Sequence, residues 1–228
     1  MFTSANAPPM PEINIFTQSS SPDVIIAQVS ASDSELKSWA QKQTRFPSRD
    51  IASLSNHRQL EHLAVDKAML ELNAPWSTAQ ITHDENGKPA LLAIDKFISI
   101  SHHAQGTLCS VIICLGNHAV GCDIERPRAQ LHAISKRFLS QQEQNHFTTT
   151  PLLCCAWGIK ESMFKTIGHG IDFRIDLIVN AIPSSVENPF EATGSIKGEP
   201  TQWRIWKVQF HNAKDKDADD LYAIAGPV

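Results

Sequence analysis

The stretch that most constrains the fold is residues 109–125, CSVIICLGNHAVGCDIE, where Gly116-Asn117 separates two β-rich runs. A two-residue connection of this composition predicts a tight hairpin. The second run ends in GCDIE, which puts Asp123 and Glu125 two positions apart on an otherwise apolar strand. Side chains two apart on a strand share a face, so these carboxylates should lie about 7 Å apart along the strand.

Two partly buried anions on one face require a cation. Burial without a counter-charge raises the pKa of a carboxyl group and destabilises the fold. Arg126 and Arg128 follow directly in the sequence and could supply ordinary ion pairs. A metal ion is the other solution, and the pair of acids alone leaves both open.

Helix and strand signals alternate along the chain, which predicts an α+β fold. Capping boxes at 32–35 and 140–143 predict helix starts, and apolar spacing predicts a helix over about 55–72. Thr150-Pro151 predicts a helix from Pro151 to about Ile167. Strands are expected near 23–29 (an edge strand), 98–102, 173–179, 203–210 and 222–225. We expect an irregular lead-in over 1–22 and two α+β halves, 23–118 and 119–228, with the metal site in the second.

The bulk composition limits the classes of function. The chain has 228 residues, a formal net charge of −4 and 42% hydrophobic residues, so a nucleic-acid role finds no support in its charge. No apolar run approaches the roughly 18 residues of a membrane helix, and the first residues lack the order of a signal peptide. We therefore expect a cytoplasmic protein. The five cysteines form no C-x-x-C pair and are expected as reduced core thiols, although a zinc site with some of the ten histidines stays an alternative.

A second cluster of charge lies in WGIKESMFK, residues 157–165. Helical spacing places Trp157, Glu161 and Lys165 on one stripe, with Lys160 and Phe164 beside it. The ordinary interpretation is an exposed Glu–Lys pair, but the aromatic residues indicate that the stripe faces protein. Glu161 could then join the two strand carboxylates in an oxygen-rich site of the kind that Mg²⁺ takes.

These two motifs together, G-x-D-x-E and then W-x-x-K-E-S-x-x-K, resemble the 4′-phosphopantetheinyl transferases of the surfactin-synthetase-activating type. Further similar segments lie in the same order along residues 45–178: His57-Arg58, Gly87-Lys88-Pro89, Ile100-Ser101-His102, and Arg137-Phe138-Leu139-Ser140 with Glu143. Each segment is weak alone, whereas the ordered series is specific.

The resemblance implies a fold and a reaction. The fold would be two similar α+β halves related by a pseudo-twofold axis, in a monomer with the cofactor site in the cleft between them. The enzyme would move the phosphopantetheine arm of coenzyme A to a serine of an apo acyl or peptidyl carrier protein and release adenosine 3′,5′-bisphosphate. Asp123, Glu125 and Glu161 would hold Mg²⁺. Glu161, or a water on the metal, would take the serine proton, and Lys165 would stabilise the departing phosphate with help from Lys160.

The resemblance also implies residues that contact coenzyme A. Ser101 and His102 would contact a phosphate, and Gly87, Lys88 and Pro89 would lie along the adenine. Basic residues would meet the 3′-phosphate, and the candidates are Arg45, Arg49 and Arg58. Each has an ordinary alternative: a loop histidine, a plain turn and solvated helix charges. Trp157 and Phe164 are assigned to packing, and the segment 126–147 to carrier recognition.

Four positions depart from the family pattern, and two other functions stay open. Ser99 replaces an asparagine, His103 a small or polar residue, and Lys67 an arginine that could bind in a bidentate manner. Cys122 replaces an aliphatic residue, and its own side chain should point away from the acids. None removes a proposed ligand. A metal-dependent nucleotide phosphohydrolase could use the same acids with water as nucleophile. A module that binds coenzyme A or a carrier without catalysis would not need them.

Overall fold

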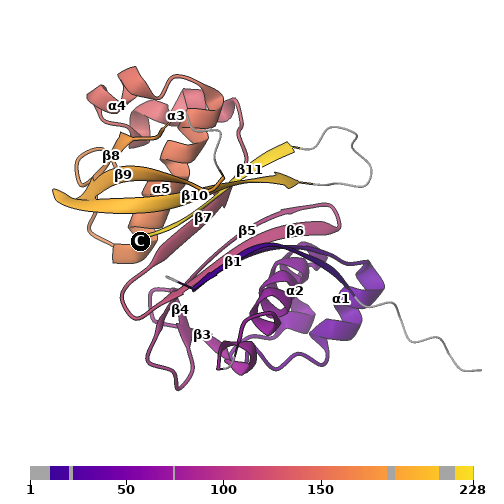
Figure 1. Ribbon diagram of the computed structural model, residues 1–228. Helices are drawn as coiled ribbons and strands as arrows, with labels where there is room; N and C mark the ends of the chain where they lie inside the picture. The colour runs from indigo at the N-terminus through magenta and orange to yellow at the C-terminus, as the bar shows by residue number, and fades with distance from the viewer. Residues whose placement is uncertain (1–10, 21–22, 74, 184–187, 211–218, 228) are drawn as a thin grey trace, which may run out of the picture.

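The computed structural model describes residues 11–20, 23–73, 75–183, 188–210 and 219–227. In this part of the chain, two antiparallel sheets face each other, and helices cover the outer face of each (Figure 1). The four layers are helix, sheet, sheet and helix. The predicted α+β class is thus confirmed. No helix within the described ranges is both long and apolar enough to cross a membrane.

The first sheet and its helices come from the N-terminal part of the chain. Its strands, in spatial order, are β1 (Glu12–Ser20), β2 (Asp23–Ser30), β6 (Leu108–Gly116) and β5 (Phe97–Gln105). Its outer face is covered by α1 (Asp33–Ala40) and α2 (Asn56–Leu70). Short 3₁₀ turns, η1 (Ile51–Ser53) and η2 (Trp76–Thr78), and a small hairpin, β3 (Ile81–His83) and β4 (Pro89–Leu91), complete this half.

The second sheet follows in the sequence. Its spatial order is β7 (Gly121–Glu125), β11 (Asp219–Gly226), β10 (Glu199–Phe210), β9 (Phe190–Ile196) and β8 (Leu177–Ala181). Its outer face carries α3 (Gln130–Phe138), α4 (Gln141–His146) and the long α5 (Thr150–Ile167). Figure 1 shows α5 lying along β7 and the neighbouring strands.

Several strands are apolar on both faces because successive side chains point to opposite sides of the sheet, and both sides are covered. On β2, Ile25 packs toward the helices while Val24 packs toward the other sheet, and on β11 Ile224 and Ala223 divide in the same way. Strands buried on both faces are expected to be almost continuously apolar. A separate core between the sheets includes Trp206 of β10. The two halves are therefore joined by a hydrophobic interface.

The predicted hairpin at Gly116-Asn117 is wrong. β6 pairs with β2 and β5, whereas β7 pairs with β11, so residues 117–120 carry the chain from one sheet to the other. The local turn signal is real, but both edges of β6 are already paired within the first sheet, with β2 and with β5. Tertiary pairing therefore overrides the hairpin preference.

The expected irregular lead-in is also wrong for residues 12–20, which form β1 and make β2 an inner strand. Residues 1–10 and 21–22 of that prediction lie outside the described residues. The two capping boxes are confirmed, with Ser32 and Ser140 each bonded reciprocally to a glutamate three residues later. Helix α5 begins one residue earlier than predicted, with Thr149 as its N-cap. Sequence reasoning missed α3 and β9.

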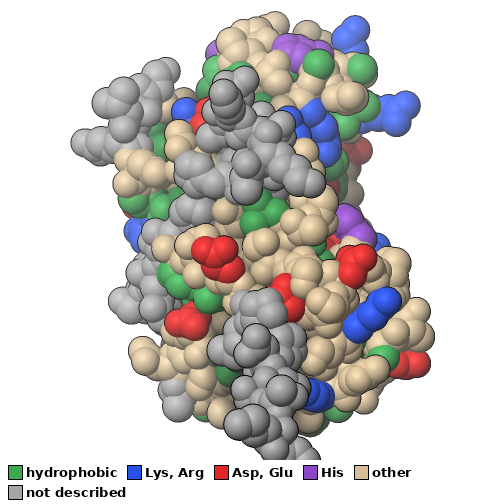
Figure 2. Space-filling model, turned by 90° about the vertical axis from the view of Figure 1, so that its right-hand side faces the viewer, with side chains coloured by type: hydrophobic (Ala, Val, Ile, Leu, Met, Phe, Trp, Pro, Cys, Tyr) green, Lys and Arg blue, Asp and Glu red, His purple; other side chains and the backbone are tan. Residues whose placement is uncertain are grey.

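One face of the molecule carries charges of both signs. Figure 2 shows Lys, Arg, Asp and Glu side chains interspersed among the coloured atoms of that view. Charges mixed in this way give no long-range attraction of a single sign across that face. A site for an anion must then be built from local groups.

Candidate functional site

Two glycines bring α5 against β7. A Cβ atom on Gly121 would lie 1.8 Å from the carbonyl oxygen of Ser162, and one on Gly158 would lie 2.4 Å from Ile224 Cδ1. At Gly121 a larger residue would have to move the helix backbone, whereas at Gly158 it would displace the Ile224 side chain. This close approach places the outer face of β7, with Asp123 and Glu125, directly against the helix.

Asp123 is half satisfied by its neighbours. It is 5% exposed, and its Oδ1 accepts hydrogen bonds of 2.8 Å from Ser101 Oγ and from Lys165 Nζ. Lys165 also donates to the Cys122 carbonyl, at 2.9 Å. Asp123 Oδ2 is buried and has no hydrogen-bond partner in the structure. One carboxylate oxygen therefore stays available for a further cation.

Glu125 and Glu161 share the environment of Asp123. Burial and the charge of Asp123 raise the pKa of Glu125, against the opposing effect of Arg128, whose ion pair measures 3.4 Å. Burial and the Asp123 charge, with Glu125 adding to them, raise the pKa of Glu161 to about 7. Glu161 is thus partly buried and close enough to Asp123 and Glu125 for their charges to act on it. Glu125 Oε2 is a second buried oxygen without a hydrogen bond.

The acids do not form a closed metal site as they stand. Over the residues that the structure describes, no three His, Cys, Asp or Glu side chains are arranged to hold a metal ion. The donor chemistry nevertheless fits a hard cation, because the carboxylates repel one another and the buried Asp123 Oδ2 accepts no hydrogen bond. Glu125 Oε2 accepts none either, and its ion pair with Arg128 is long, at 3.4 Å. In this structure, the Lys165 ammonium group supplies the positive charge beside Asp123.

Lys160 corrects the expectation that it contacts the cofactor. Its side chain is fully buried, and Nζ donates three hydrogen bonds of 2.8 Å, to Glu143 Oε2 and to the carbonyls of Phe138 and Phe173. Burial lowers the pKa of Lys160, and Glu143 opposes that shift. An ammonium group has three protons, and all three are used. Lys160 holds α3, α4 and α5 together.

The aromatic residues of α5 pack as expected. Trp157 stacks on Phe173 with ring centroids 5.9 Å apart, and Phe164 lies 5.5 Å from the same ring. Cys122 is buried in the core between the sheets, on the opposite side of β7 from the acids, which confirms its predicted direction.

A cavity of about 850 Å³ lies where the two halves meet. The first half contributes the turn at Gly87 and Lys88 and the start of β5, and the second half contributes the end of α5, including Lys165. Gly87 has φ +79°, and Asp84 Oδ1 accepts from the backbone N–H groups of Asn86 and Lys88, which fixes the turn. Lys88 Nζ donates to the Thr166 carbonyl at 3.4 Å and so links the turn to α5.

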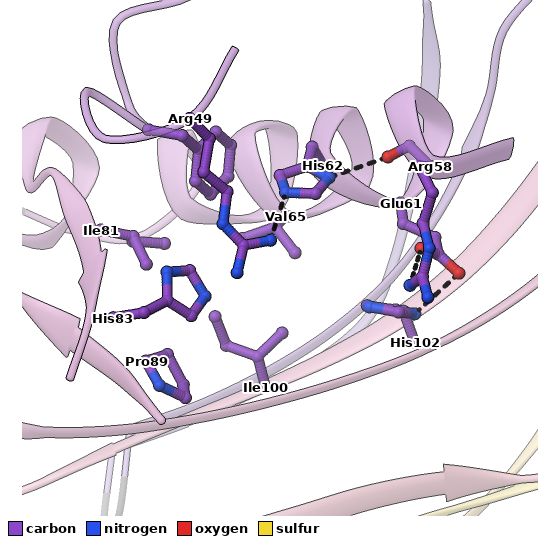
Figure 3. Close-up of a pocket in the computed structure, with 11 residues that line it drawn as sticks. Arg49, Arg58, Glu61, His62, Val65, Ile81, His83, Pro89, Ile100 and His102 are labelled. Atoms are coloured by element: carbon purple, nitrogen blue, oxygen red, sulfur yellow. Dashed lines mark hydrogen bonds and ion pairs between the residues drawn. The ribbon is translucent and has the colours of Figure 1, made fainter. Parts of the chain in front are cut away.

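A smaller cavity of about 160 Å³ adjoins the first, because Pro89 and Ile100 line both. Figure 3 shows its polar groups: Arg49, Arg58, His62, His83 and His102, with the single carboxylate Glu61. Burial would raise the pKa of Glu61, but hydrogen bonds and charge from His102 and Arg58 lower it to about 2. The cavity therefore combines two arginines and three imidazoles against one anion.

The remaining predicted residues are distributed between these cavities and the core. Arg49, Arg58 and His102 line the smaller cavity, and Ser101 lies on the opposite face of β5, bonded to Asp123. Arg45 lines neither cavity. It is buried, pairs with Asp66 at 2.6 Å and donates to the carbonyls of Ser77 and Ala79, which corrects its predicted contact with a phosphate.

Sequence reasoning missed Glu61, His62 and His83. The first two share α2 with Arg58, and helical spacing places Arg58, Glu61 and His62 on adjoining positions of one face. That spacing was the available signal. His83 lies on β3, and no local pattern connects it with α2.

A comparison with family models finds a match in the second half of the chain. Residues 119–225 match the family model described as the 4′-phosphopantetheinyl transferase superfamily. A 4′-phosphopantetheinyl transferase of Bacillus subtilis is 30% identical over 99 residues, which are 40% of this chain and 42% of that protein.

Two further relatives give the same result. The 4′-phosphopantetheinyl transferase gsp of Aneurinibacillus migulanus is 30% identical over 126 residues, which are 51% of this chain and 50% of that protein. The 4′-phosphopantetheinyl transferase Sfp of Bacillus subtilis strain 168 is 27% identical over 107 residues, or 44% and 46% of the two chains. The chain thus spans about half the length of the curated relatives it matches. The resemblance seen in the motifs is confirmed by these matches, and residues 119–225 are similar to the 4′-phosphopantetheinyl transferase superfamily.

Proposed function

We propose that this protein transfers the 4′-phosphopantetheine arm of coenzyme A to a serine of an apo acyl or peptidyl carrier protein. The second product is adenosine 3′,5′-bisphosphate. One observation carries the proposal: Asp123, Glu125, Glu161 and Lys165 gather where α5 meets β7, and Lys165 also lines the large cavity between the halves.

The two cavities fit adjoining parts of coenzyme A. The large cavity has the volume of sites that enclose a cofactor. The Gly87-Lys88-Pro89 turn would lie along the adenine, and the smaller cavity, with Arg49, Arg58 and His102, would receive the 3′-phosphate. Because the cavities share a wall, one ligand could occupy both.

The cation site is proposed from the same acids. Asp123, Glu125 and Glu161 would hold Mg²⁺, and the pyrophosphate of coenzyme A would supply further oxygen ligands. Magnesium in such sites is commonly held by one or two carboxylates together with substrate phosphates. An incomplete protein shell is therefore compatible with the proposal. When bound, the ion would neutralise charge that develops on the phosphates during transfer.

The side chains have complementary tasks in the transfer. The serine Oγ forms a bond to the phosphorus of the phosphopantetheine, and the bond from that phosphorus to the bridging pyrophosphate oxygen breaks. Glu161, whose pKa is raised to about 7, would accept the serine proton near neutral pH. The net influence of Asp123 and Glu161 raises the pKa of Lys165 despite its burial, so its ammonium group would stabilise the departing phosphate.

Further features of the proposal follow from the family. The two sheets with their helices would be halves related by a pseudo-twofold axis, 23–118 and 119–228, in a cytoplasmic monomer. The segment 126–147 would meet the carrier. Exposed basic residues on it, Arg128, Lys136 and Arg137, support this because carrier proteins are acidic.

Two other functions make different predictions. A metal-dependent nucleotide phosphohydrolase would cleave coenzyme A with water and need no carrier. A non-catalytic module would bind coenzyme A and leave it intact.

The test is a mass measurement. The purified protein with Mg²⁺ and coenzyme A should add one phosphopantetheine group to an apo carrier protein, and Glu161→Gln should abolish this while circular dichroism stays unchanged. Glu71→Gln, at an exposed position after α2, is the matched control and should transfer normally. Carriers of fatty-acid, polyketide and peptide synthesis should all be tried. Release of free phosphopantetheine without a carrier would favour the hydrolase instead.

A further inference from the structure

The smaller cavity holds an arginine that is bound to a histidine. Arg49 Nη1 lies 3.4 Å from His62 Nε2, and Figure 3 shows the guanidinium group reaching over the cavity toward that ring. Arg49 is exposed at the surface, so its side chain is free to turn toward a ligand in the cavity. The ring of His62 is held in place by Phe46, whose edge-to-face contact has a centroid distance of 4.8 Å.

The partners of His62 define its tautomer. His62 Nδ1 lies 2.8 Å from the Arg58 carbonyl oxygen, which can only accept, so Nδ1 carries the proton. A guanidinium group can only donate, so Nε2 must offer its lone pair to Arg49. His62 is therefore neutral in this arrangement, and it is a hydrogen-bond acceptor for Arg49.

We propose that His62 is a specificity residue for a phosphate monoester dianion, taking up one proton from solvent when the ligand draws Arg49 away. The protonated Nε2 then donates a hydrogen bond to the phosphate, while Nδ1 continues to donate to the Arg58 carbonyl. No covalent bond changes, and the only transfer is one proton from water or buffer to the ring. The proposal rests on the proposed function, because the ligand would be the 3′-phosphate of coenzyme A.

The surrounding charges support this exchange. Burial and the charges of Arg49 and His102 lower the pKa of His62, while its bond to the Arg58 carbonyl and the charge of Glu61 raise it. His83 faces Arg49 from β3, and burial, Arg49 and His62 lower its pKa against the effect of Asp84. A dianion would raise the pKa of His62, since it adds two negative charges and removes Arg49 from the ring. A phosphate diester has one charge and would do so less.

Calorimetry can measure the proton directly. We would titrate the protein at pH 7 with adenosine 3′,5′-bisphosphate and with adenosine 5′-monophosphate, each in two buffers of different ionisation enthalpy. The ligands differ only in the 3′-phosphate, so the 5′-phosphate cancels in the comparison. At this pH, about a tenth of a phosphate monoester is still singly protonated, and its own proton release is small.

The expected result is an uptake of about half a proton to one proton more for the bisphosphate than for the monophosphate. The affinity ratio of the two ligands should fall about tenfold between pH 6.5 and pH 8.5, the size of effect expected for one hydrogen bond to a charged group. His62→Gln should remove most of the extra uptake and flatten the ratio across this range, since glutamine can still accept from Arg49 but does not titrate. His118→Gln, an exposed histidine between β6 and β7, should behave as the wild type.

Each other outcome overturns the proposal. Equal proton uptake for the two ligands, or the same uptake in His62→Gln, would show that His62 does not respond to the 3′-phosphate. Failure of both ligands to bind would show that the cavity is not a phosphate site. Phosphopantetheine transfer measured in the same preparation separates these failures from a failure of the proposed function. A thermal melt of His62→Gln confirms that the variant is folded.

Discussion

At the scale of single residues, the site stores electrostatic repulsion. Glu161 lies near Asp123 and Glu125, and its pKa rises to about 7 from an ordinary value of 4.5. Between these values the folded state binds more protons than the unfolded state, so Glu161 makes the fold less stable as pH rises through this window. The repulsion is removed by a proton, by a cation or by substitution of one acid.

Glu161→Gln should therefore stabilise the protein while it abolishes transfer. In the absence of divalent ions, we expect a gain of about 1–2 kcal/mol in the free energy of unfolding at pH 8, after allowance for solvent screening. At pH 5 most of the gain should vanish, because Glu161 is then protonated in the folded state. Urea titrations at both pH values measure this. An equal gain at both would mean that charge is not its cause.

At the scale of elements, the buried pair of Lys160 and Glu143 joins three helices and a strand. Glu143 also accepts from the backbone N–H groups of Ser140 and Val179, so α4 is tied to α5 and to β8. The motif around Lys160 predicted a contact with the cofactor. The helical spacing of Trp157, Glu161 and Lys165 predicted the residues of the site better. Lys160 lies off that stripe and bonds to the end of α3, a helix that the sequence did not predict.

Lys160→Met should destabilise the fold by about 3–5 kcal/mol, because it leaves Glu143 charged and buried without its partner. The KM for coenzyme A of the folded fraction should stay unchanged. Urea unfolding and steady-state kinetics at low temperature measure the two effects. Lys37→Met, at an exposed position of α1, serves as the control and should change stability by less than about 0.5 kcal/mol. A raised KM with unchanged stability would instead support the predicted contact between Lys160 and coenzyme A.

Gly121→Ala tests the contact between α5 and β7. The added methyl group would overlap the Ser162 carbonyl, so the helix must shift, at a cost of about 1–3 kcal/mol or more. Because the shift moves Glu161 relative to Asp123, kcat should fall even in the folded fraction. Gly106→Asn is the control, since it lies in an open turn at φ +61° that asparagine tolerates. Normal activity in Gly121→Ala would show that the site does not depend on this close packing.

At the scale of the whole molecule, local signals predicted the elements better than their pairing. The capping boxes and Thr150-Pro151 act within a few residues and were interpreted correctly. The partner of β7, in contrast, is β11, about 100 residues later in the chain, and no local pattern encodes that choice. The acids could be predicted from local spacing. Asp123 and Glu125 are two residues apart on a strand, and Glu161 shares a helical stripe with Trp157 and Lys165. Asp66 as the partner of Arg45, and His83 as a wall of the small cavity, depend on long-range contacts.

Both halves line the large cavity, so coenzyme A, the proposed substrate, should stabilise them together. At a concentration 100 times its dissociation constant, it should add about 2.7 kcal/mol to the free energy of unfolding. Thermal unfolding followed by near- and far-ultraviolet circular dichroism should show one transition that moves upward as a unit. Adenosine, which lacks phosphates, provides the control and should produce little shift. Two transitions, of which only one moved, would mean that the ligand contacts a single half.

The hydroxyl groups of Ser99 and Ser101 on β5 also link the two sheets. The N–H of Cys122 donates to Ser99 Oγ at 3.0 Å, and Ser101 bonds to Asp123, so two border strands of different sheets, β5 and β7, meet through side chains. An uncovered border strand invites pairing with another molecule. The contacts of Ser99 and Ser101 therefore also protect these borders from self-association, and at Ser101, which bonds to Asp123, selection for solubility and for catalysis would act on the same position.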